Sequence, residues 1–474
     1  MPENQYNRKD TLSIYNYSKR LITHCLREFA PDADEPAGKG GLAQLVEKLY
    51  FGYDVNSCPE ADFAEAGLEL KCTPLKRNKE EELCIKERLV CGMINYREDW
   101  DKSFENSHFY KKCLVMLLLF YLHQGGVSRL NLEFVYSVLW KIPEKDLLIM
   151  KNDYEKIICK IEQGLAHTLS EGDTMYLGAC RKGQDAGTVT QQHGSAILAP
   201  TRAWCLKMAY MRTVLEEVKQ KQINGAYSNF EYSPTKNLET LTKEEELRNQ
   251  TFDEVILNRF APYMQKDYEE FCRLAGRIAT ASKQKYFIMA NSIAGASNVS
   301  NINHSEEFLK AGITMKTIRV QKSGRVKESM SFENIDYKEV CDCGEWYDSR
   351  LYELFSSRFL FVVFKETEGE ITLGEGAVEP RYVLDDVFFW TMPVEDLDVA
   401  ELYWKNIRQC VINDTISAEY FWKIDDKKYF HVRPKGKNSH DYADNPNGGS
   451  APKYCYWFNS EYVRNILEKR HDTI

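Results

Sequence analysis

The chain has 474 residues, of which 43% are hydrophobic and 28% charged, and its formal net charge is −9 at pH 7. This length exceeds one ordinary hydrophobic core, so we expect two or three domains, and the composition excludes a disordered or fibrous protein. The acidic balance argues against a generally basic surface for nucleic acid but permits one locally basic cleft.

Several classes of protein are disfavoured by simple signals. Residues 1–10 are polar and lack the apolar core of a signal peptide, so we expect a cytoplasmic protein. The longest apolar run, 113–122, is too short to cross a bilayer, so no membrane partner is expected. The 14 cysteines include no CxxC pair, which favours small buried side chains over a zinc site. No glycine-rich phosphate loop occurs, so no nucleotide cofactor is expected.

Three segments of the first half have clear periodicity. Residues 41–50 carry apolar side chains at 42, 45, 46 and 49, which predicts a helix that ends at Phe51-Gly52-Tyr53. Residues 68–73 alternate between apolar and polar, which indicates a strand, and the apolar run 113–121 indicates a buried strand. Interleaved helices and strands predict an α/β (α+β) fold with a mixed central sheet flanked by helices.

A polar segment divides the chain into halves of similar length. Residues 219–250 are rich in Gly, Pro, Ser, Asn and charge, which is typical of a linker followed by a helix start, with Thr242 as a cap. We therefore expect domains over 1–225 and 251–474, joined by a linker over 226–250.

The two halves resemble each other at four places in the same order. One match ends at Lys71 and Lys316, with an offset of 245, and another begins at Lys86 and Lys327, with an offset of 241. Two more begin at Trp140 and Trp390, with an offset of 250, and at Arg202 and Lys453, with an offset of about 252. Offsets that drift slowly are what small loop insertions in a duplicated domain produce.

The strand at 68–73 carries the residues that point to chemistry. Glu69 and Lys71 leave the same face of the strand, and a turn at Ala66-Gly67 can bring Asp62 beside Glu69. Two carboxylates with adjacent main-chain oxygens suit Mg²⁺, and a lysine beside a metal-bound water can orient it. The pattern alone leaves open a solvated strand face.

The wider context adds a family resemblance. Lys39-Gly40-Gly41, Pro59-Glu60-Ala61-Asp62, the Glu69-x-Lys71 strand and Thr73-Pro74 resemble, in order and spacing, the MutH family of GATC-specific endonucleases. The two-headed arrangement resembles the Sau-three-A group of type IIE restriction enzymes. That resemblance implies two tandem MutH-like domains of the PD-(D/E)xK class, with Asp62 and Glu69 on Mg²⁺ and Lys71 on the attacking water.

Further roles follow from the same resemblance. Glu47 would be a supporting acid, although it could be a solvated helix residue. Lys112 would lie near the scissile phosphate, although it could simply flank the buried strand, and Lys111 competes for the role. Lys39 is expected to contact DNA.

The second half of the chain differs from the first at the positions of the expected metal ligands. Asp62 corresponds to Glu307, which could still bind metal, but Glu69 corresponds to Thr314, which could not. Lys71 is matched by Lys316, and Lys112 is assigned to Arg358. We expect this half to have lost hydrolysis and to hold DNA through Lys316 and Arg358.

The family's DNA-reading VRPK segment is better kept in the second half. Arg433 and Lys435 lie in Val-Arg-Pro-Lys-Gly, whereas the first half has Ala-Cys-Arg-Lys-Gly with Arg181 and Lys182. Arginine suits bidentate contact with guanine, although its charge also serves phosphates. In the first half, a plain surface turn is the alternative.

The resulting hypothesis is a Mg²⁺-dependent type II restriction endonuclease that cuts duplex DNA at GATC. A catalytic first domain would be followed by a domain that binds a second DNA site as an allosteric effector. A symmetric site favours transient dimerisation on DNA. The alternatives are a mismatch-repair-type nickase and a DNA-binding protein that does not cut.

Overall fold

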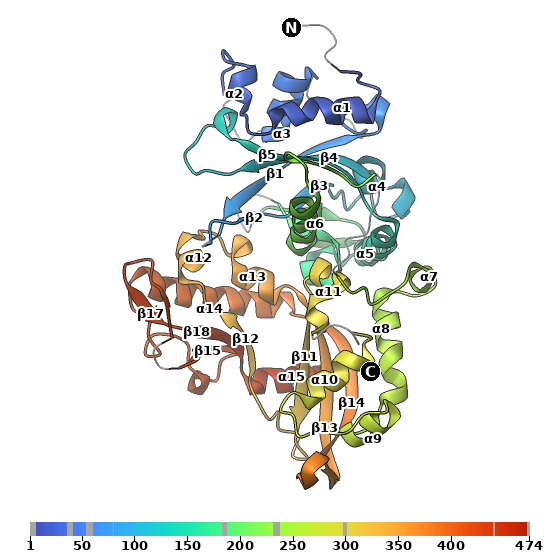
Figure 1. Cartoon of the computed structure of the whole chain (residues 1–474), viewed down its shortest axis with the longest axis vertical. Helices are drawn as coiled ribbons and strands as arrows, with labels where there is room; N and C mark the ends of the chain where they lie inside the picture. The colour runs from blue at the N-terminus through green and yellow to red at the C-terminus, as the bar shows by residue number, and fades with distance from the viewer. Residues whose placement is uncertain are drawn as a thin grey trace. The chain divides into compact units, whose positions relative to one another are not determined.

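The computed structural model describes residues 6–35, 41–53, 60–78, 80–182, 187–230, 238–296, 301–438 and 441–471. The chain divides into two compact units (Figure 1). The first unit comprises Met1–Thr251 together with Leu309–Gly312, and the second comprises Phe252–Phe308 and Ile313–Ile474.

The first unit contains both helices and strands. Its helices are α1 (Thr11–Ser18), α2 (Leu26–Phe29), α3 (Leu42–Leu45), the π-helical turn η2 (Val46–Phe51), α4 (His108–Cys113), α5 (Glu144–Glu162), α6 (Met208–Lys221) and α7 (Glu244–Leu247). Its strands are β1 (Glu69–Arg77), β2 (Leu83–Ile85), β3 (Leu89–Met93), β4 (Val115–Leu122), β5 (Phe134–Lys141), β6 (Leu177–Arg181), β7 (Val189–Gln192), β8 (Ser195–Pro200), β9 (Arg202–Leu206) and β10 (Ala226–Ser228).

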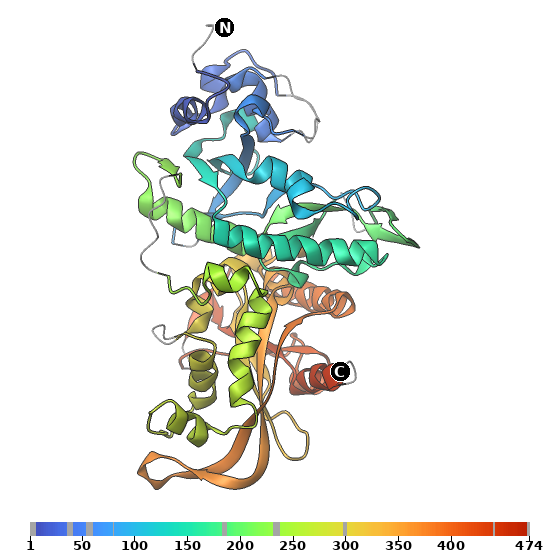
Figure 2. The same cartoon turned by 90° about the vertical axis from the view of Figure 1, so that its right-hand side faces the viewer.

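The main sheet of this unit is mixed, as expected, with strand order β10-β5-β4-β1-β2. Strand β4 pairs in parallel with β1 and antiparallel with β5. Its residues 116–120 are fully buried, which explains their unbroken apolar sequence. Helix α5 buries residues with helical spacing, including Met150, Tyr154, Ile157 and Ile161. Figure 2 shows this helix along its length.

Three local expectations need correction in the first unit. Cys113 ends helix α4 rather than starting the buried strand, which begins at Val115. Residues 226–228, placed in a linker, form β10, which pairs in parallel with β5 and extends the main sheet. A three-residue edge strand is too short to give a periodic signal. Helix α7 is capped at Lys243, not at Thr242, which is buried.

The second unit repeats this construction with fewer strands. Its helices are α8 (Phe252–Phe260), α9 (Tyr268–Leu274), α10 (Lys285–Ile293), α11 (Glu306–Ala311), α12 (Tyr337–Asp342), α13 (Arg350–Phe355), α14 (Val394–Ile412) and α15 (Ser460–His471). Its strands are β11 (Thr314–Val320), β12 (Met330–Asn334), β13 (Arg358–Thr372), β14 (Val378–Thr391), β15 (Phe430–Pro434), β16 (Tyr442–Asp444), β17 (Ser450–Pro452) and β18 (Tyr454–Phe458).

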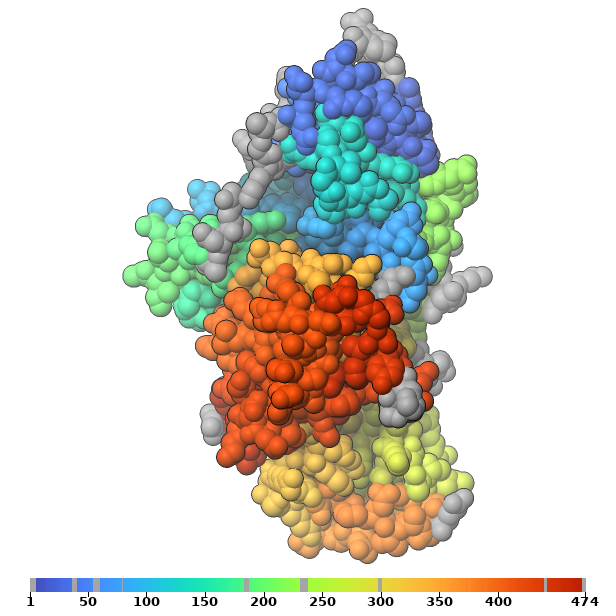
Figure 3. All heavy atoms as spheres, turned by 90° about the vertical axis from the view of Figure 1, so that its left-hand side faces the viewer, coloured from blue at the N-terminus to red at the C-terminus, as the bar shows by residue number. Residues whose placement is uncertain are grey.

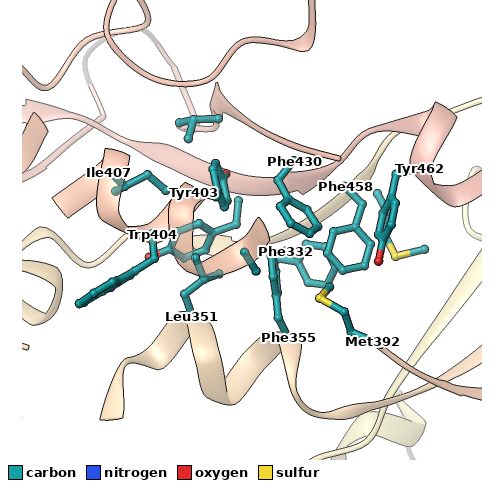
Figure 4. Close-up of a cluster of buried hydrophobic side chains, with 14 of the residues drawn as sticks. Phe332, Leu351, Phe355, Met392, Tyr403, Trp404, Ile407, Phe430, Phe458 and Tyr462 are labelled. Atoms are coloured by element: carbon teal, nitrogen blue, oxygen red, sulfur yellow. The ribbon is translucent and has the colours of Figure 1, made fainter. Parts of the chain in front are cut away.

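The core of the second unit is aromatic. The sheets have orders β11-β13-β14 and β12-β18-β15, and Figure 2 shows β13 and β14 as a long curling pair. Figure 4 shows Phe332, Phe355, Phe430 and Phe458 directed into one cluster, with Tyr462 at its margin. The Phe332 and Phe458 ring centroids are 4.5 Å apart. Figure 3 shows the orange-to-red later part of the chain on the surface of this unit.

Strand register supports the internal repeat. Trp140 lies opposite Met116 in the first unit, and Trp390 lies opposite Phe359 in the second. Met116 in turn faces Glu69 across a parallel pair, and Phe359 faces Thr314 in the same way. The strands β1, β4 and β5 therefore correspond in register to β11, β13 and β14. The residue offsets are 245, 243 and 250, respectively.

Two general findings concern the described ranges. Within them, no helix is both long enough and apolar enough to cross a membrane. The thirteen cysteines that they contain are free thiols, and seven of those are buried.

Candidate active site

A tight turn brings the first carboxylate to the start of β1. The turn passes through the 3₁₀ helix η3 (Ala64–Ala66) and Gly67, whose φ of 61° lies in the left-handed region that favours glycine. The amide of Phe63 donates to the carbonyl of Leu68 at 3.0 Å, which closes the turn. Asp62, just before the turn, is thereby held beside the first residues of the strand.

Asp62 and Glu69 are linked by reciprocal backbone contacts. The Asp62 Oδ2 atom accepts a hydrogen bond from the amide of Leu70 at 2.9 Å. The amide of Asp62 donates to Glu69 Oε2 at 3.2 Å. These two bonds fix both carboxylates on the same side of the strand, and Glu69 is only 1% exposed.

Two lysines converge on the other oxygen of Glu69. Lys71 Nζ donates to Glu69 Oε1 at 2.6 Å, and Lys112 Nζ lies 3.6 Å from the same atom. Lys112 reaches this place because α4 leads directly into β4, the parallel neighbour of β1. Burial opposes the charge on Lys71, but Cys113 and Glu69 outweigh it and raise the pKa of the ammonium group.

Glu47 completes the cluster from the π-helical turn η2. Burial, followed by the charges of Asp62 and Glu69, raises the pKa of Glu47 to about 7. Burial and the Glu69 charge also raise the pKa of Asp62. The site thus gathers three mutually repelling carboxylates and two ammonium groups in a poorly solvated space. π-Helical turns occur frequently at functional sites.

The donor chemistry fits a hard divalent cation. Asp62 and Glu69 supply carboxylate oxygens, and a cation between them would relieve the repulsion that, after burial, raises the pKa of Asp62. In the described part of the chain, no three His, Cys, Asp or Glu side chains are arranged as a metal cage. A pair of carboxylates suits an ion that keeps waters and substrate oxygens, as Mg²⁺ does.

The remaining predicted residues of the first unit lie elsewhere. Lys39 lies outside the described residues. Arg181 ends β6, in the three-stranded sheet β3-β9-β6, and Lys182 follows it as an exposed residue. Their contact with DNA stays a prediction.

Known proteins match this chain in two ways. The family model of the DNA mismatch repair enzyme MutH matches residues 51–153, the stretch with the turn, β1 and α4. The type II restriction enzyme Sau3AI from Staphylococcus aureus is 29% identical over 94% of this chain and 92% of its own length. The chain therefore resembles a MutH-like restriction enzyme of the Sau3AI type.

Shorter relatives match less of the chain. The DNA mismatch repair protein MutH from Shewanella woodyi is 26% identical over 40% of this chain and 80% of its own length. The MutH protein from Yersinia enterocolitica is 24% identical over 39% of this chain and 79% of its own length. The expected resemblance and the α/β fold with a MutH-like domain are confirmed.

In the second unit of this MutH-like chain, both carboxylate positions have changed. Thr314 occupies the strand position of Glu69, as its register with Phe359 establishes. The amide of Met315, equivalent to Leu70, donates to Asn303 Oδ1 at 2.7 Å. Asn303, from the 3₁₀ helix η9 (Ile302–His304), therefore makes the contact that Asp62 makes in the first unit. Glu307, the aligned residue, is fully buried on α11.

The lysine of the motif is retained but pairs differently. Lys316 Nζ donates to the carbonyl of Ser331 at 2.8 Å and lies 4.8 Å from the centre of the Phe332 ring. Burial, followed by the charge of Lys435, lowers the pKa of Lys316 to about 8. Lys435 Nζ donates to the carbonyl of Phe332 at 2.9 Å. Two ammonium groups therefore lie over neighbouring residues of β12.

Arg433 and Trp457 complete a basic surface beside these lysines. Arg433 is exposed at the end of β15, and its guanidinium lies 5.1 Å from the centre of the Trp457 ring. Lys435 lies 5.9 Å from the same ring. We call Lys316, Arg433, Lys435 and Trp457 the basic cluster. Among the described residues, it has no ion pair with a carboxylate.

The assignment of Arg358 is wrong. Its guanidinium makes two hydrogen bonds with the Asp253 carboxylate, at 2.9 and 2.8 Å, and the residue is 6% exposed. By register it corresponds to Val115, not to Lys112. The Arg358–Asp253 ion pair joins α8 to β13. Because the guanidinium is buried and already neutralised, it is not placed to contact DNA.

Some residues that shape the sites carried no signal in the sequence. Asn303 is not at the position aligned with Asp62, so only the folded chain reveals its role. Asp153 accepts three backbone amides at the start of β6, including those of Met175 and Leu177 at 2.7 and 2.9 Å. Trp457 lies inside the fourth repeat match, but its sequence neighbours give no sign of its place beside Arg433 and Lys435.

Proposed function

We propose that this chain is a type II restriction endonuclease that hydrolyses phosphodiester bonds of duplex DNA at GATC sites. The relation to Sau3AI over 94% of the chain supports the reaction and the site. The single observation that carries the proposal is the convergence of Asp62, Glu69, Lys71 and Lys112 at the start of β1. Buried carboxylates that share two lysines are costly unless they serve a site.

The side chains of the first unit divide the chemistry among them. Asp62 and Glu69 would hold Mg²⁺, which supplies a more acidic water and neutralises charge on the phosphate when bound. Lys71 orients the attacking water through its ammonium group, and Lys112 stabilises the negative charge that develops on the phosphate. Glu47, with a pKa of about 7, can accept a proton from that water near neutral pH.

The second unit binds DNA without cutting it. Thr314 and Asn303 replace the two carboxylates, so the donor set for a cation is lost. The basic cluster retains positive charge and an aromatic face, which suit phosphates and, through Arg433, the edge of a guanine. DNA bound here would act as an effector if it favours the active arrangement of the first unit.

The oligomeric state follows from the symmetry of the substrate. GATC reads the same on both strands, so two cuts in one site call for two active centres. Transient dimerisation on DNA meets this need. The stoichiometry of the complex with a duplex that contains one site tests it, because two chains per duplex are expected.

Plasmid digestion tests the main proposal. Wild type and Glu69→Gln are compared with Mg²⁺ on adenine-methylated and unmethylated plasmid. Glu82→Gln, which changes an exposed glutamate just before β2, is the matched control. We expect GATC-mapped fragments from wild type and control. The Glu69→Gln variant should cut roughly 10²–10³-fold more slowly, the scale for losing one preorganised electrostatic group. Nicked circles as the sole product would favour the nickase, and binding without cutting would leave a DNA-binding protein.

The effector role is tested by point variants. A truncation at 226 would remove β10 and the segment Leu309–Gly312, which belong to the first unit. Arg433→Met combined with Lys435→Met should instead remove stimulation of cutting by a second GATC duplex, while basal cutting persists. Equal stimulation in wild type and variant would refute the effector role.

A further inference from the structure

The two units share a buried tyrosine–carboxylate pair. In the first, the Tyr210 hydroxyl donates to Asp146 Oδ2 at 2.9 Å, and in the second, the Tyr462 hydroxyl donates to Asp396 Oδ2 at 2.8 Å. Each aspartate lies in the first turn of a 19-residue helix, α5 or α14. Each of these helices begins directly after a proline. The pairs are equivalent by the repeat, with offsets of 250 and 252.

The pair in the first unit holds an ammonium group. Lys310, in the segment Leu309–Gly312 that belongs to this unit, places Nζ 3.0 and 2.8 Å from the two oxygens of Asp146. The same atom lies 5.8 Å from the centre of the Tyr210 ring and 6.0 Å from that of Tyr176. The lysine side chain is 9% exposed and the aspartate 2%. A carboxylate and aromatic rings together form a site for a buried cation.

The second unit has the same walls around a cavity. A cavity of about 440 Å³ is lined by Trp390, Asp396, Tyr429 and Tyr462, among others. Tyr429 corresponds to Tyr176 with an offset of 253, and its ring stacks on that of Tyr462 at 4.6 Å. Figure 4 shows Tyr462 at the margin of the aromatic cluster.

Asp396 is buried and incompletely paired. It is 7% exposed, and Tyr462 is its one hydrogen-bond donor among the described side chains. Its other oxygen is available to the cavity that Asp396 lines. Burial raises the pKa of this carboxyl although Tyr462 and Lys469 act in the opposite direction. A buried carboxylate without a full set of partners favours a cationic ligand.

The cations at the rim do not fill this role. Arg470 lies 5.3 Å from the centre of the Phe388 ring, and its Nε is 3.8 Å from Asp386 Oδ2. Lys469 and Glu468 line the same cavity with opposite charges. Among the described residues, neither cation forms an ion pair with Asp396.

We propose that the cavity of the second unit binds a primary alkylammonium group, with its nitrogen on Asp396 and its methylenes against Tyr429 and Trp390. The occupant is a lysine side chain or a free alkylamine, which present the same chemistry. The first unit supplies the precedent, since its equivalent walls enclose Lys310. This site does not depend on the proposed nuclease function.

Ligand-observed NMR saturation transfer on the full chain tests the site. The probes are n-butylammonium and N-acetyl-lysine methylamide, each compared with an uncharged analogue, n-butanol and N-acetyl-norleucine methylamide. We expect saturable binding of the charged probes alone. Asp396→Asn should weaken it at least tenfold, whereas Asp425→Asn, an exposed aspartate on the same unit, should have no effect.

A second variant controls for misfolding of Asp396→Asn. Tyr429→Leu removes one wall and leaves the Tyr462–Asp396 bond intact, so it should weaken binding of the charged probes without unfolding the unit. Equal binding of charged and uncharged probes, or unchanged binding in a folded Asp396→Asn protein, would overturn the proposal.

Sedimentation distinguishes the sources of the ammonium group. If a lysine of a second copy occupies the cavity, wild type should self-associate, and both Asp396→Asn and excess n-butylammonium should reverse this. A monomer that binds the amine probes would assign the cavity to a free amine or to a lysine of another protein. Either result supports the site once the probes bind.

Discussion

Asn303 in the second unit makes the hydrogen bond that Asp62 makes in the first. Asn303 Oδ1 accepts the amide of Met315 at 2.7 Å, and Asp62 Oδ2 accepts the equivalent amide of Leu70 at 2.9 Å. An asparagine keeps the geometry of the turn but removes the negative charge. The turn is thus the same in both units, while the carboxylate that we propose as a cation ligand is absent from the second.

This relationship predicts that a cation site can be rebuilt. Asn303→Asp with Thr314→Glu restores both carboxylates beside Lys316, so the variant should bind one more Mn²⁺ per chain than its parent. Isothermal titration in a Glu69→Gln background, in which the first site is disabled, gives the stoichiometry. Asn303→Asp alone is the control, because one carboxylate is a poor site for such an ion. An unchanged stoichiometry in the double variant would show that the site needs further residues.

A second prediction concerns the pH dependence of the first unit. Rising pH through about 7 ionises Glu47 and adds a negative charge to the cluster. The Mg²⁺ concentration for half-maximal cutting should therefore fall between pH 6 and pH 8 in wild type and stay nearly flat in Glu47→Gln. Cutting rates measured over a Mg²⁺ titration at each pH give this value. The same inflection in both proteins would assign the titration to another group.

The same carboxyl predicts a trend in stability without metal. Its pKa of about 7 in the folded protein exceeds the unfolded value of roughly 4.3, so the folded state holds the proton more tightly. Stability from this group is present below about pH 4.3 and is lost as pH rises through about 7. Thermal unfolding in EDTA should show a decline over this range that Glu47→Gln reduces. A decline of equal size in the variant contradicts the assignment.

The sequence predicted the site best where geometry is local. One strand and one tight turn place Asp62, Glu69 and Lys71 together, so spacing was enough to predict their proximity. Lys112 reaches Glu69 through the parallel pairing of β1 and β4, which periodicity could not predict. The family resemblance assigned Lys112 to the site but gave no strand pairing. The Asn303 contact and the Arg358–Asp253 pair join distant segments, and loop insertions shifted the alignment that assigned Arg358.

A fourth prediction is that DNA binding by the second unit does not need a divalent cation. In a Glu69→Gln background with EDTA, a GATC duplex should still bind through the basic cluster. Lys435→Met should lower the slope of log affinity against log salt by about 1 if it contacts a phosphate. Arg433→Met should cost ~1–3 kcal/mol, with relaxed sequence preference, if it contacts a guanine.

The control for these measurements is Lys283→Met, which removes an exposed lysine of the same unit at a distance in sequence from the cluster. Fluorescence anisotropy over a salt series, with GATC and scrambled duplexes, gives both quantities. Complete loss of binding in EDTA would show that binding needs a divalent cation. That result would contradict the role given to the basic cluster.

The last prediction concerns the buried ion pair of Lys310 and Asp146. Lys310→Met leaves the Asp146 carboxylate buried with Tyr210 but without its counter-ion, and losing one partner of such a pair costs ~3–5 kcal/mol. The unfolding midpoint in urea should fall accordingly. The double variant Lys310→Met with Asp146→Asn should recover part of the loss, because no unpaired charge then remains buried. Added n-butylammonium should raise the midpoint of the single variant and leave Lys283→Met unchanged, since only the former has an emptied ammonium site. Equal midpoints for Lys310→Met and wild type would show that the carboxylate is neutral in the folded chain, and the precedent for the second-unit cavity would fail with it.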